Sequence, residues 1–179
     1  MKKLLMTTAM VALLSSPAMA ATTGLYVGAD AEHTQFLSSD TSPDTFNSGG
    51  LHVGANFTPN FGVELGASTS LQSDANGVTK ANETTYAADL MGYLPTAVEK
   101  LDLVGLVGAT YNTLDSHVSG VGNEAAKYGA EIGTGVQYQL TNHFSTRALV
   151  KYEDISFKDT GTGNLDNAVQ YSLGVNYSF

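Results

Sequence analysis

Tyr171-Ser172-Leu173-Gly174-Val175-Asn176-Tyr177-Ser178-Phe179 alternates strictly between apolar or aromatic residues and small or polar ones. A period of two is typical of a β-strand, because successive side chains of a strand point to opposite faces of the sheet. One face would carry Tyr171, Leu173, Val175, Tyr177 and Phe179, and the other only serine, glycine and asparagine. The stretch therefore predicts a strand with one apolar face.

The same alternation recurs in seven segments further upstream. They lie at residues 25–31, 51–57, 61–67, 86–94, 101–111, 128–138 and 144–152. None of the residues in the apolar phase is charged. An even number of such segments, with strands of roughly nine to eleven residues, predicts an all-β fold: an eight-stranded antiparallel up-and-down transmembrane β-barrel. Closure would leave no open sheet edge in lipid.

Charged residues occupy the opposite phase of these segments. They are Asp30, Glu32, Glu64, Asp89, Asp102, Glu131, Arg147, Lys151 and Glu153. A membrane barrel keeps charge off its lipid face, so this phase is expected to line the lumen. A soluble sandwich would show the same alternation with its polarity reversed, so alternation alone does not separate the two folds.

Three further features favour the membrane barrel. The connections alternate between short ones and long polar ones, as they do in bacterial barrels. The short ones lie at 58–60, 95–100 and 141–143, and the long ones at about 34–49, 70–84, 112–126 and 155–167. Aromatic residues suited to a membrane interface gather beside the short turns, at Phe57, Phe61, Tyr138, Phe144, Tyr177 and Phe179. The last strand also runs on to Phe179.

The first twenty residues predict export. Lys2 and Lys3 precede an apolar stretch that is too short to span a bilayer, and small residues follow at Ala18 and Ala20. We expect a signal peptide at 1–20, cleaved after Ala20, and a barrel domain at 21–179. The mature chain would keep 6 basic residues against 17 acidic ones, a formal charge of −11, and it has no cysteine. Nucleic acid is therefore not an expected partner.

The chain resembles the OmpA-type family of eight-stranded outer-membrane β-barrel domains. The residues that carry the resemblance are Gly24-Leu25-Tyr26-Val27-Gly28-Ala29, the segment 140–148 and the closing segment 171–179. The resemblance implies a C-terminal signal for the outer-membrane assembly machinery, matched by Tyr171, Leu173, Val175, Tyr177 and Phe179. It also implies salt bridges inside the barrel. Because the sequence ends with the barrel, we expect no peptidoglycan-binding domain.

The lumen is the first candidate site. We expect Asp30, Glu64, Asp89 and Glu131 to gather around Arg147 and Lys151, which lie four residues apart and so face the same side of one strand. Glu32, Asp102 and Glu153 are expected nearer the rims, in contact with water. An eight-stranded barrel is only just wide enough for side chains to fill it, so a salt-bridged, water-filled core is favoured over a weakly cation-selective pore.

An enzymatic site is the less favoured alternative. His143-Phe144-Ser145 with Glu153 resembles the His-x-Ser arrangement with a downstream acid of lipid-directed acyl hydrolases. However, His143 falls in a short turn, at the opposite rim from surface lipid, and a nucleophile and its base must meet at the substrate. We expect no catalytic residues.

Metal binding is also not expected. The segment 159–166 is rich in oxygen ligands and glycine, but its spacing departs from the twelve-residue calcium loop. His33, His52 and His117 lack any ligand spacing. The sequence therefore predicts no metal and no cofactor.

The resulting hypothesis is an integral protein of the bacterial outer membrane that is not an enzyme. Its barrel would have a structural or surface-interaction role and display four polar extracellular loops. Expected partners are outer-membrane lipid and lipopolysaccharide, the outer-membrane assembly machinery, and host or cell-surface ligands that bind the loops. A narrow pore and a lipid-directed enzyme remain the alternatives.

Overall fold

The computed structural model describes residues 23–37, 45–70, 73–75, 79–118, 121–157 and 165–179. The predicted signal peptide and most of the segment 159–166 lie outside these residues. The described residues form strands and no helix, and none of them belongs to a helix capable of crossing a membrane.

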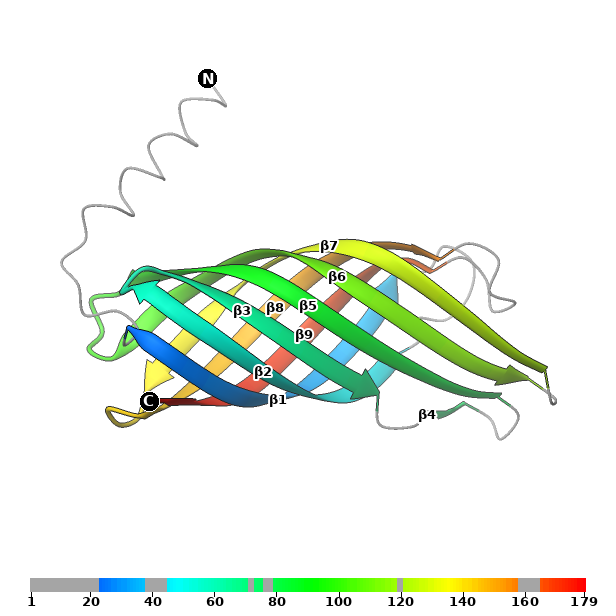
Figure 1. The fold of residues 1–179 in the computed structure, drawn as a ribbon, viewed down its shortest axis with the longest axis horizontal. Coiled ribbons are helices and arrows are strands. Elements are labelled where there is room, and N and C mark those ends of the chain that lie inside the picture. The colour runs from blue at the N-terminus through cyan, green and yellow to red at the C-terminus, as the bar shows by residue number, and fades with distance from the viewer. Residues whose placement is uncertain (1–22, 38–44, 71–72, 76–78, 119–120, 158–164) are drawn as a thin grey trace, which may run out of the picture.

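Nine antiparallel strands make up one sheet (Figure 1). They are β1 (Gly24–Leu37), β2 (Thr45–Thr58), β3 (Phe61–Ser70), β4 (Ser73–Ala75), β5 (Thr79–Pro95), β6 (Leu101–Val118), β7 (Val121–Gln139), β8 (Phe144–Phe157) and β9 (Leu165–Ser178). Strand β4 has only three residues and pairs with the far end of β5. The remaining eight are the predicted barrel strands.

Two pairings close the barrel. Strand β1 pairs with β9 from Tyr26 to Leu37, and β3 pairs with β5 from Phe61 to Thr69. All other long strands pair with their neighbours along the chain. The predicted fold class, an eight-stranded antiparallel barrel, is confirmed.

Threonine hydroxyls stabilise two of the short turns. Thr58 Oγ1 accepts a hydrogen bond of 3.0 Å from the Phe61 amide, and Thr141 Oγ1 accepts one of 3.0 Å from the Phe144 amide. Each bond satisfies a backbone donor at the point where the chain reverses. Because neighbouring barrel strands run antiparallel, the turns between β2 and β3 and between β7 and β8 lie at the same end of the barrel, which we call the short-turn end.

The strands at the opposite end are longer than predicted. Strands β5, β6 and β7 have 17, 18 and 19 residues rather than roughly nine to eleven. The pairing of β6 with β7 continues to Val118 and Val121, whereas β7 pairs with β8 only from Ala130. The segment 112–126, predicted to be a long loop, is therefore mostly a β-ribbon that projects beyond the barrel wall (Figure 1).

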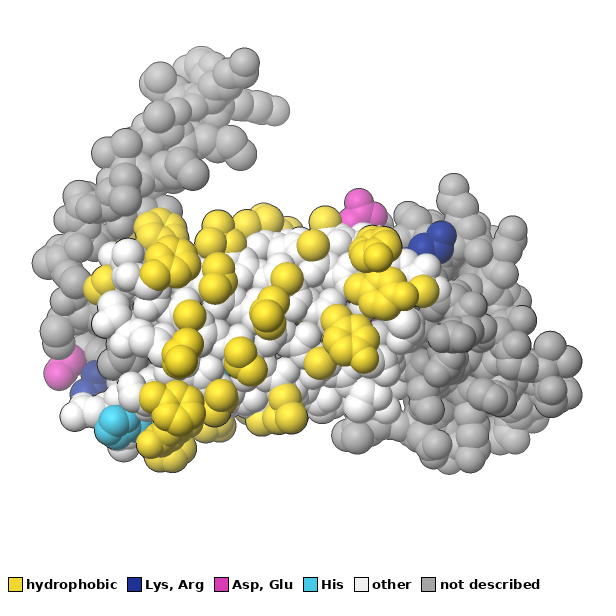
Figure 2. Space-filling view, in the orientation of Figure 1, with side chains coloured by type: hydrophobic (Ala, Val, Ile, Leu, Met, Phe, Trp, Pro, Cys, Tyr) yellow, Lys and Arg dark blue, Asp and Glu magenta, His cyan; other side chains and the backbone are white. Residues whose placement is uncertain are grey.

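The wall of the barrel has an apolar outside and a polar inside. Leu51 and Leu173, from the apolar phase, are 70% and 64% exposed, while Glu131 and Arg147, from the opposite phase, are 4% and 3% exposed. Figure 2 shows hydrophobic side chains along the wall, with charged side chains only toward the two ends in this view. This polarity is the reverse of a soluble sandwich and suits a barrel that stands in lipid.

Aromatic side chains mark both ends of the apolar wall. Tyr177 packs against Phe144 and Phe179 at the short-turn end, with ring centroids 5.1 and 5.2 Å apart. At the other end Tyr86, Tyr111 and Tyr128 lie opposite one another on β5, β6 and β7. The sequence predicted the first band; the second, which we call the tyrosine row, was not recognised. Rings at both ends define the apolar belt between them.

A charge placed in this belt tests the membrane arrangement. Leu173→Lys puts an ammonium group among exposed apolar side chains of β9, and we expect it to lower the free energy of unfolding in lipid vesicles by about 2–4 kcal/mol. Leu140→Lys, in the short turn after β7, is the matched control and should change it by less than about 0.5 kcal/mol. Equal stability of both variants in urea titrations would contradict a lipid-facing wall.

Candidate functional site

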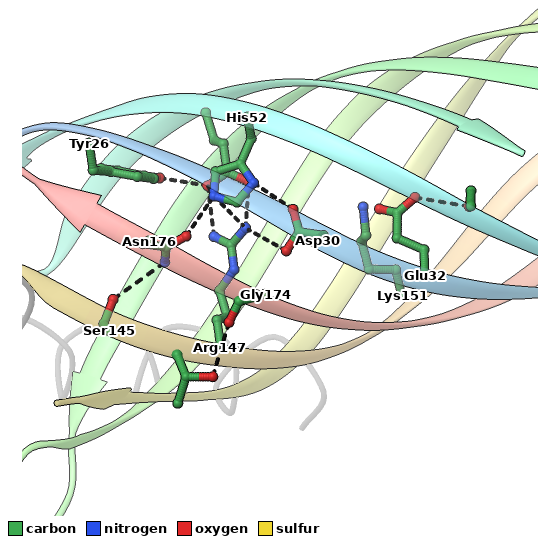
Figure 3. Close-up of polar contacts among 12 residues, drawn as sticks. Tyr26, Asp30, Glu32, His52, Ser145, Arg147, Lys151, Gly174 and Asn176 are labelled. Carbon is green, nitrogen blue, oxygen red and sulfur yellow. Dashed lines mark hydrogen bonds and ion pairs between the residues drawn. The ribbon is translucent and has the colours of Figure 1, made fainter. Parts of the chain in front are cut away.

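The lumen contains a hydrogen-bonded group of side chains centred on Arg147 of β8 (Figure 3). Its guanidinium donates two hydrogen bonds to Glu64 of β3, from Nη1 to Oε2 at 2.7 Å and from Nη2 to Oε1 at 2.9 Å. Tyr26 of β1 donates a further bond of 2.7 Å to Glu64 Oε2. This bidentate pairing is the strongest geometry available to arginine and carboxylate, and it connects opposite walls of the barrel.

His52 of β2 joins this group from the other side. Hydrogen bonds connect its Nδ1 to Asp30 Oδ2 at 2.5 Å and its Nε2 to Asn176 Oδ1 at 2.6 Å. Arg147 Nη2 lies 3.5 Å from His52 Nε2 and 3.9 Å from Asp30 Oδ1. Tyr26, Asp30, His52, Glu64, Arg147 and Asn176 therefore form one connected cluster, which we call the arginine hub.

The hub depends on a glycine in the wall. A Cβ atom at Gly28 of β1 would overlap both His52 Nε2 and Asn176 Oδ1. Only a residue without a side chain leaves room for these two groups to meet over β1. In Leu25-Tyr26-Val27-Gly28, the inward-facing positions are therefore Tyr26, which hydrogen bonds within the hub, and Gly28, which leaves room for it.

A second group of charged residues lies farther from the short turns. Lys151 Nζ is 3.3 Å from Glu131 Oε2. Glu153 accepts a hydrogen bond of 2.8 Å from Asn112 Nδ2 and another from the Thr110 hydroxyl. Lys151 thus pairs with a different carboxylate from the one that pairs with Arg147, although the two bases lie on the same face of β8.

Apolar side chains fill much of the remaining lumen. Met91, Tyr93, Val104, Leu106 and Leu149 form a buried cluster inside the barrel. Between the described residues the lumen also holds a polar cavity of about 40 Å³, lined in part by His52 and Arg147, and a separate one of about 10 Å³, lined in part by Tyr26 and Asn176. The arginine hub lies between them, so it separates an outer cavity from an inner cavity near the short turns.

The structure distributes the predicted lumen residues over these two groups. Asp30, Glu64 and Arg147 meet in the hub, Lys151 meets Glu131, and Asp89 lines the same cavity as both groups. The expected contact with water is wrong for two acids, because Asp102 and Glu153 are 5% and 8% exposed, although Asp102 does lie at the short-turn end of β6. Glu32 is half-buried and accepts a hydrogen bond of 3.2 Å from Ser48.

Sequence reasoning missed three members of the hub: Tyr26, His52 and Asn176. The sequence carried a usable signal, since each lies in the polar phase of its strand, for example His52 between Leu51 and Val53. A polar side chain on the inward face of a narrow barrel has to find a partner there. His52 was judged only for metal-ligand spacing, and this did not indicate its role.

The three residues of the hydrolase alternative do not come together. His143 Nδ1 is hydrogen bonded to the Ser178 carbonyl at 2.9 Å, and its ring stacks on Tyr177. Ser145 is buried in the inner cavity, where its hydroxyl accepts a bond from Asn176 Nδ2 at 3.5 Å. Glu153 lines the outer cavity instead. The side chains thus point to different partners and form no nucleophile–base pair.

Comparison with protein families gives one match over almost the whole chain. The model described as outer membrane protein beta-barrel domain matches residues 6–179. The 31 kDa outer-membrane immunogenic protein of Brucella melitensis is 28% identical over 161 residues, and the Brucella suis protein of the same name matches equally. The match covers 73% of this chain and 65% of the relatives' length.

Solved structures share the fold at low identity. Neisserial surface protein A superposes with a TM-score of 0.75 at 19% identity and covers 88% of this chain and 98% of its own. Ail, the attachment invasion locus protein of Yersinia pestis, gives 0.64 at 16% identity, with 88% and 100% covered. The structure of Ail with the heparin analogue sucrose octasulfate gives a TM-score of 0.62, at 16% identity and the same coverage. The predicted resemblance to OmpA-type barrels is confirmed.

Removing the central cation should destabilise the barrel. Arg147→Met leaves the buried carboxylate of Glu64 without its guanidinium partner, and we expect a loss of about 3–5 kcal/mol in the free energy of unfolding. The double variant Arg147→Met/Glu64→Gln removes the unpaired charge as well and should recover a large part of this loss. Urea unfolding in lipid vesicles measures both. A single variant as stable as the wild type would show that the hub does not hold the walls together.

Proposed function

Because the chain belongs to the outer membrane protein beta-barrel domain family, we propose that it is a surface-display protein whose closed barrel anchors polar extracellular segments. It is an integral outer-membrane β-barrel protein, which orients the short turns toward the periplasm and the projecting ribbon toward the outside. The proposal concerns what the barrel does there: it holds loops and ribbon for contact with other molecules, and it passes neither solute nor substrate.

The observation that carries this proposal is the projecting ribbon. Strands β6 and β7 continue from the tyrosine row at Tyr111 and Tyr128 to Val118 and Val121, still paired residue by residue. At about 3.3 Å per residue, these seven residues on each strand add roughly 20 Å of paired strand beyond the apolar belt. A paired ribbon is stiffer than a loop and costs less conformational entropy when a partner binds.

The charge of the displayed segments limits the kind of partner. The segments 34–49, 70–84, 112–126 and 155–167 contain eight acidic residues and two lysines, a net charge of −6. Ail is described with a sulfated heparin analogue, but a net acidic surface would repel such a polyanion. We therefore favour basic or neutral host or cell-surface ligands, and lipopolysaccharide bridged by divalent cations.

The proposal includes export and assembly by the usual route. The signal peptide at 1–20 would be removed after Ala20, and the outward-facing Tyr171, Leu173, Val175, Tyr177 and Phe179 would be read by the outer-membrane assembly machinery. It includes no catalytic role, since Ser145 lies in the inner cavity, across the arginine hub from the outer surface. We expect Ser145→Ala to leave lipid composition unchanged.

Epitope insertion tests the display topology. A short peptide tag inserted after residue 160, between β8 and β9, should be labelled by antibody on intact cells, because β8 ends and β9 begins at the end of the barrel opposite the short turns. The same tag after Asn142, in the short turn between β7 and β8, is the control and should be labelled only after the outer membrane is permeabilised. The reverse pattern would contradict the proposed orientation.

Planar-bilayer recording distinguishes the proposed surface-display role from the alternative of a narrow pore. With the arginine hub and the apolar cluster between the two cavities, folded protein should give no steady current above that of the bare bilayer. Folding is checked on the same sample by the gel shift between unboiled and boiled protein. A steady cation-selective current from folded wild-type protein would favour the pore over the display role.

A further inference from the structure

Four carboxylates of the lumen lie in one row across neighbouring strands. The row begins at Glu64 on β3, which pairs with Asp89 on β5. Asp89 pairs with Gly108 on β6, and Gly108 pairs with Glu131 on β7. Glu131 in turn pairs with Glu153 on β8. All four acids are at least 92% buried, with exposures of 7%, 7%, 4% and 8% along the row. Carboxylates so close in a water-poor space repel one another strongly unless something neutralises them.

The two ends of the row are neutralised or hydrogen bonded, but the middle is neutralised only in part. Glu64 has Arg147 and Tyr26, and Glu153 has Thr110 and Asn112. In the middle, Lys151 reaches only Oε2 of Glu131. Asp89 Oδ1 and Glu131 Oε1 are buried oxygens without a hydrogen-bond partner. Buried oxygens of this kind cost free energy unless a ligand, water or ion satisfies them.

Gly108 is what brings the middle pair together. A Cβ atom at this position would overlap Asp89 Oδ1, so the Asp89 side chain lies over the backbone of β6 and reaches toward β7. Any other residue at this position would push the carboxylate away from Glu131. The arrangement therefore places two incompletely satisfied carboxylates on either side of a glycine.

The outer cavity has both the volume and the negative charge that suit a bound cation. Asp89 and Glu131 both line the outer cavity, whose volume of about 40 Å³ is enough for a few water molecules. Its lining includes six acids against Arg147 and Lys151. Even with His52 charged, the cavity would keep a negative excess that its own side chains do not balance.

We propose that Asp89 and Glu131 bind a hard cation of the calcium or magnesium class in the outer cavity, with water completing its coordination. Carboxylate oxygens and water are the ligands that such ions prefer, and magnesium is often held by only one or two carboxylates plus water. No three Asp, Glu or His side chains of the described ranges form a ready-made metal site, so water has to supply the remaining ligands. Ligand spacing along the chain predicted no metal; the row of carboxylates exists only once the strands are paired. The site is independent of what the loops bind.

Cation titration of the folded barrel tests the site. Protein in detergent micelles, freed of metal with a chelator, is titrated with calcium chloride by calorimetry, and its unfolding temperature is recorded in calcium chloride and in choline chloride of equal ionic strength. We expect one saturable calcium site per barrel and a rise in unfolding temperature that choline, too large for the cavity, does not produce. Asp89→Asn should weaken this binding by roughly tenfold or more, since affinity follows the number of charged ligands.

A matched variant separates the site from the acidic surface. Asp102→Asn makes the same change at a buried acid that lies outside the lining of the outer cavity, at the short-turn end of β6, and should keep the wild-type response. Glu131→Gln is the second variant of the site and should behave like Asp89→Asn. An equal calcium response in wild type and both site variants would assign the ion to the loops and overturn the proposal. A wild type without any calcium response would also overturn the proposal. If Asp89→Asn were then more stable than the wild type, the result would point instead to a proton shared by Asp89 and Glu131.

Discussion

The pairings of β1 with β9 and of β3 with β5 leave the membrane-spanning sheet without an edge. Inside hydrocarbon there is no water to satisfy a free amide or carbonyl, so each open edge would cost several kcal/mol per exposed group. Closure forces every side chain of the wall either outward into lipid or inward into a narrow lumen. The alternation of the sequence, with Leu173 outside and Arg147 inside, follows from this single condition.

In a narrow lumen, polar side chains from strands that are far apart in the sheet are close enough to hydrogen bond with one another. Arg147 and Glu64 are separated by 83 residues and lie on β8 and β3, which are not neighbours in the sheet. Their hydrogen bonds cross the lumen, whereas the backbone bonds run only around the wall. The hub thus links opposite walls across the lumen, beside the buried apolar cluster of Met91, Tyr93, Val104, Leu106 and Leu149.

The sequence predicted most of the wall and little of the lumen's pairing, for a physical reason. Lipid on one face imposes a strict period of two, and this reveals each strand within the apolar belt and the inward position of Glu64, Glu131 and Arg147. Beyond the belt no lipid face imposes this alternation, and the segment 112–126, which forms most of the β6–β7 ribbon, was predicted to be a loop. Partners such as His52 and Asn176, 124 residues apart, depend on register summed around the barrel, which one sequence does not reveal.

The unsatisfied carboxylates lie on two of the three long strands, β5, β6 and β7, that stay paired farthest from the short turns. Asp89 lies on β5 and Glu131 on β7, and in the sequence of each strand the tyrosine row, with Tyr86 and Tyr128, stands three residues farther toward the ribbon. A cation held between these carboxylates would link β5 to β7 across Gly108, just below the point where β7 loses its pairing with β8. Divalent ions available at the outer surface would then stiffen the base of the ribbon that carries the displayed segments. The lumen charges and the surface role would be two consequences of one arrangement of strands.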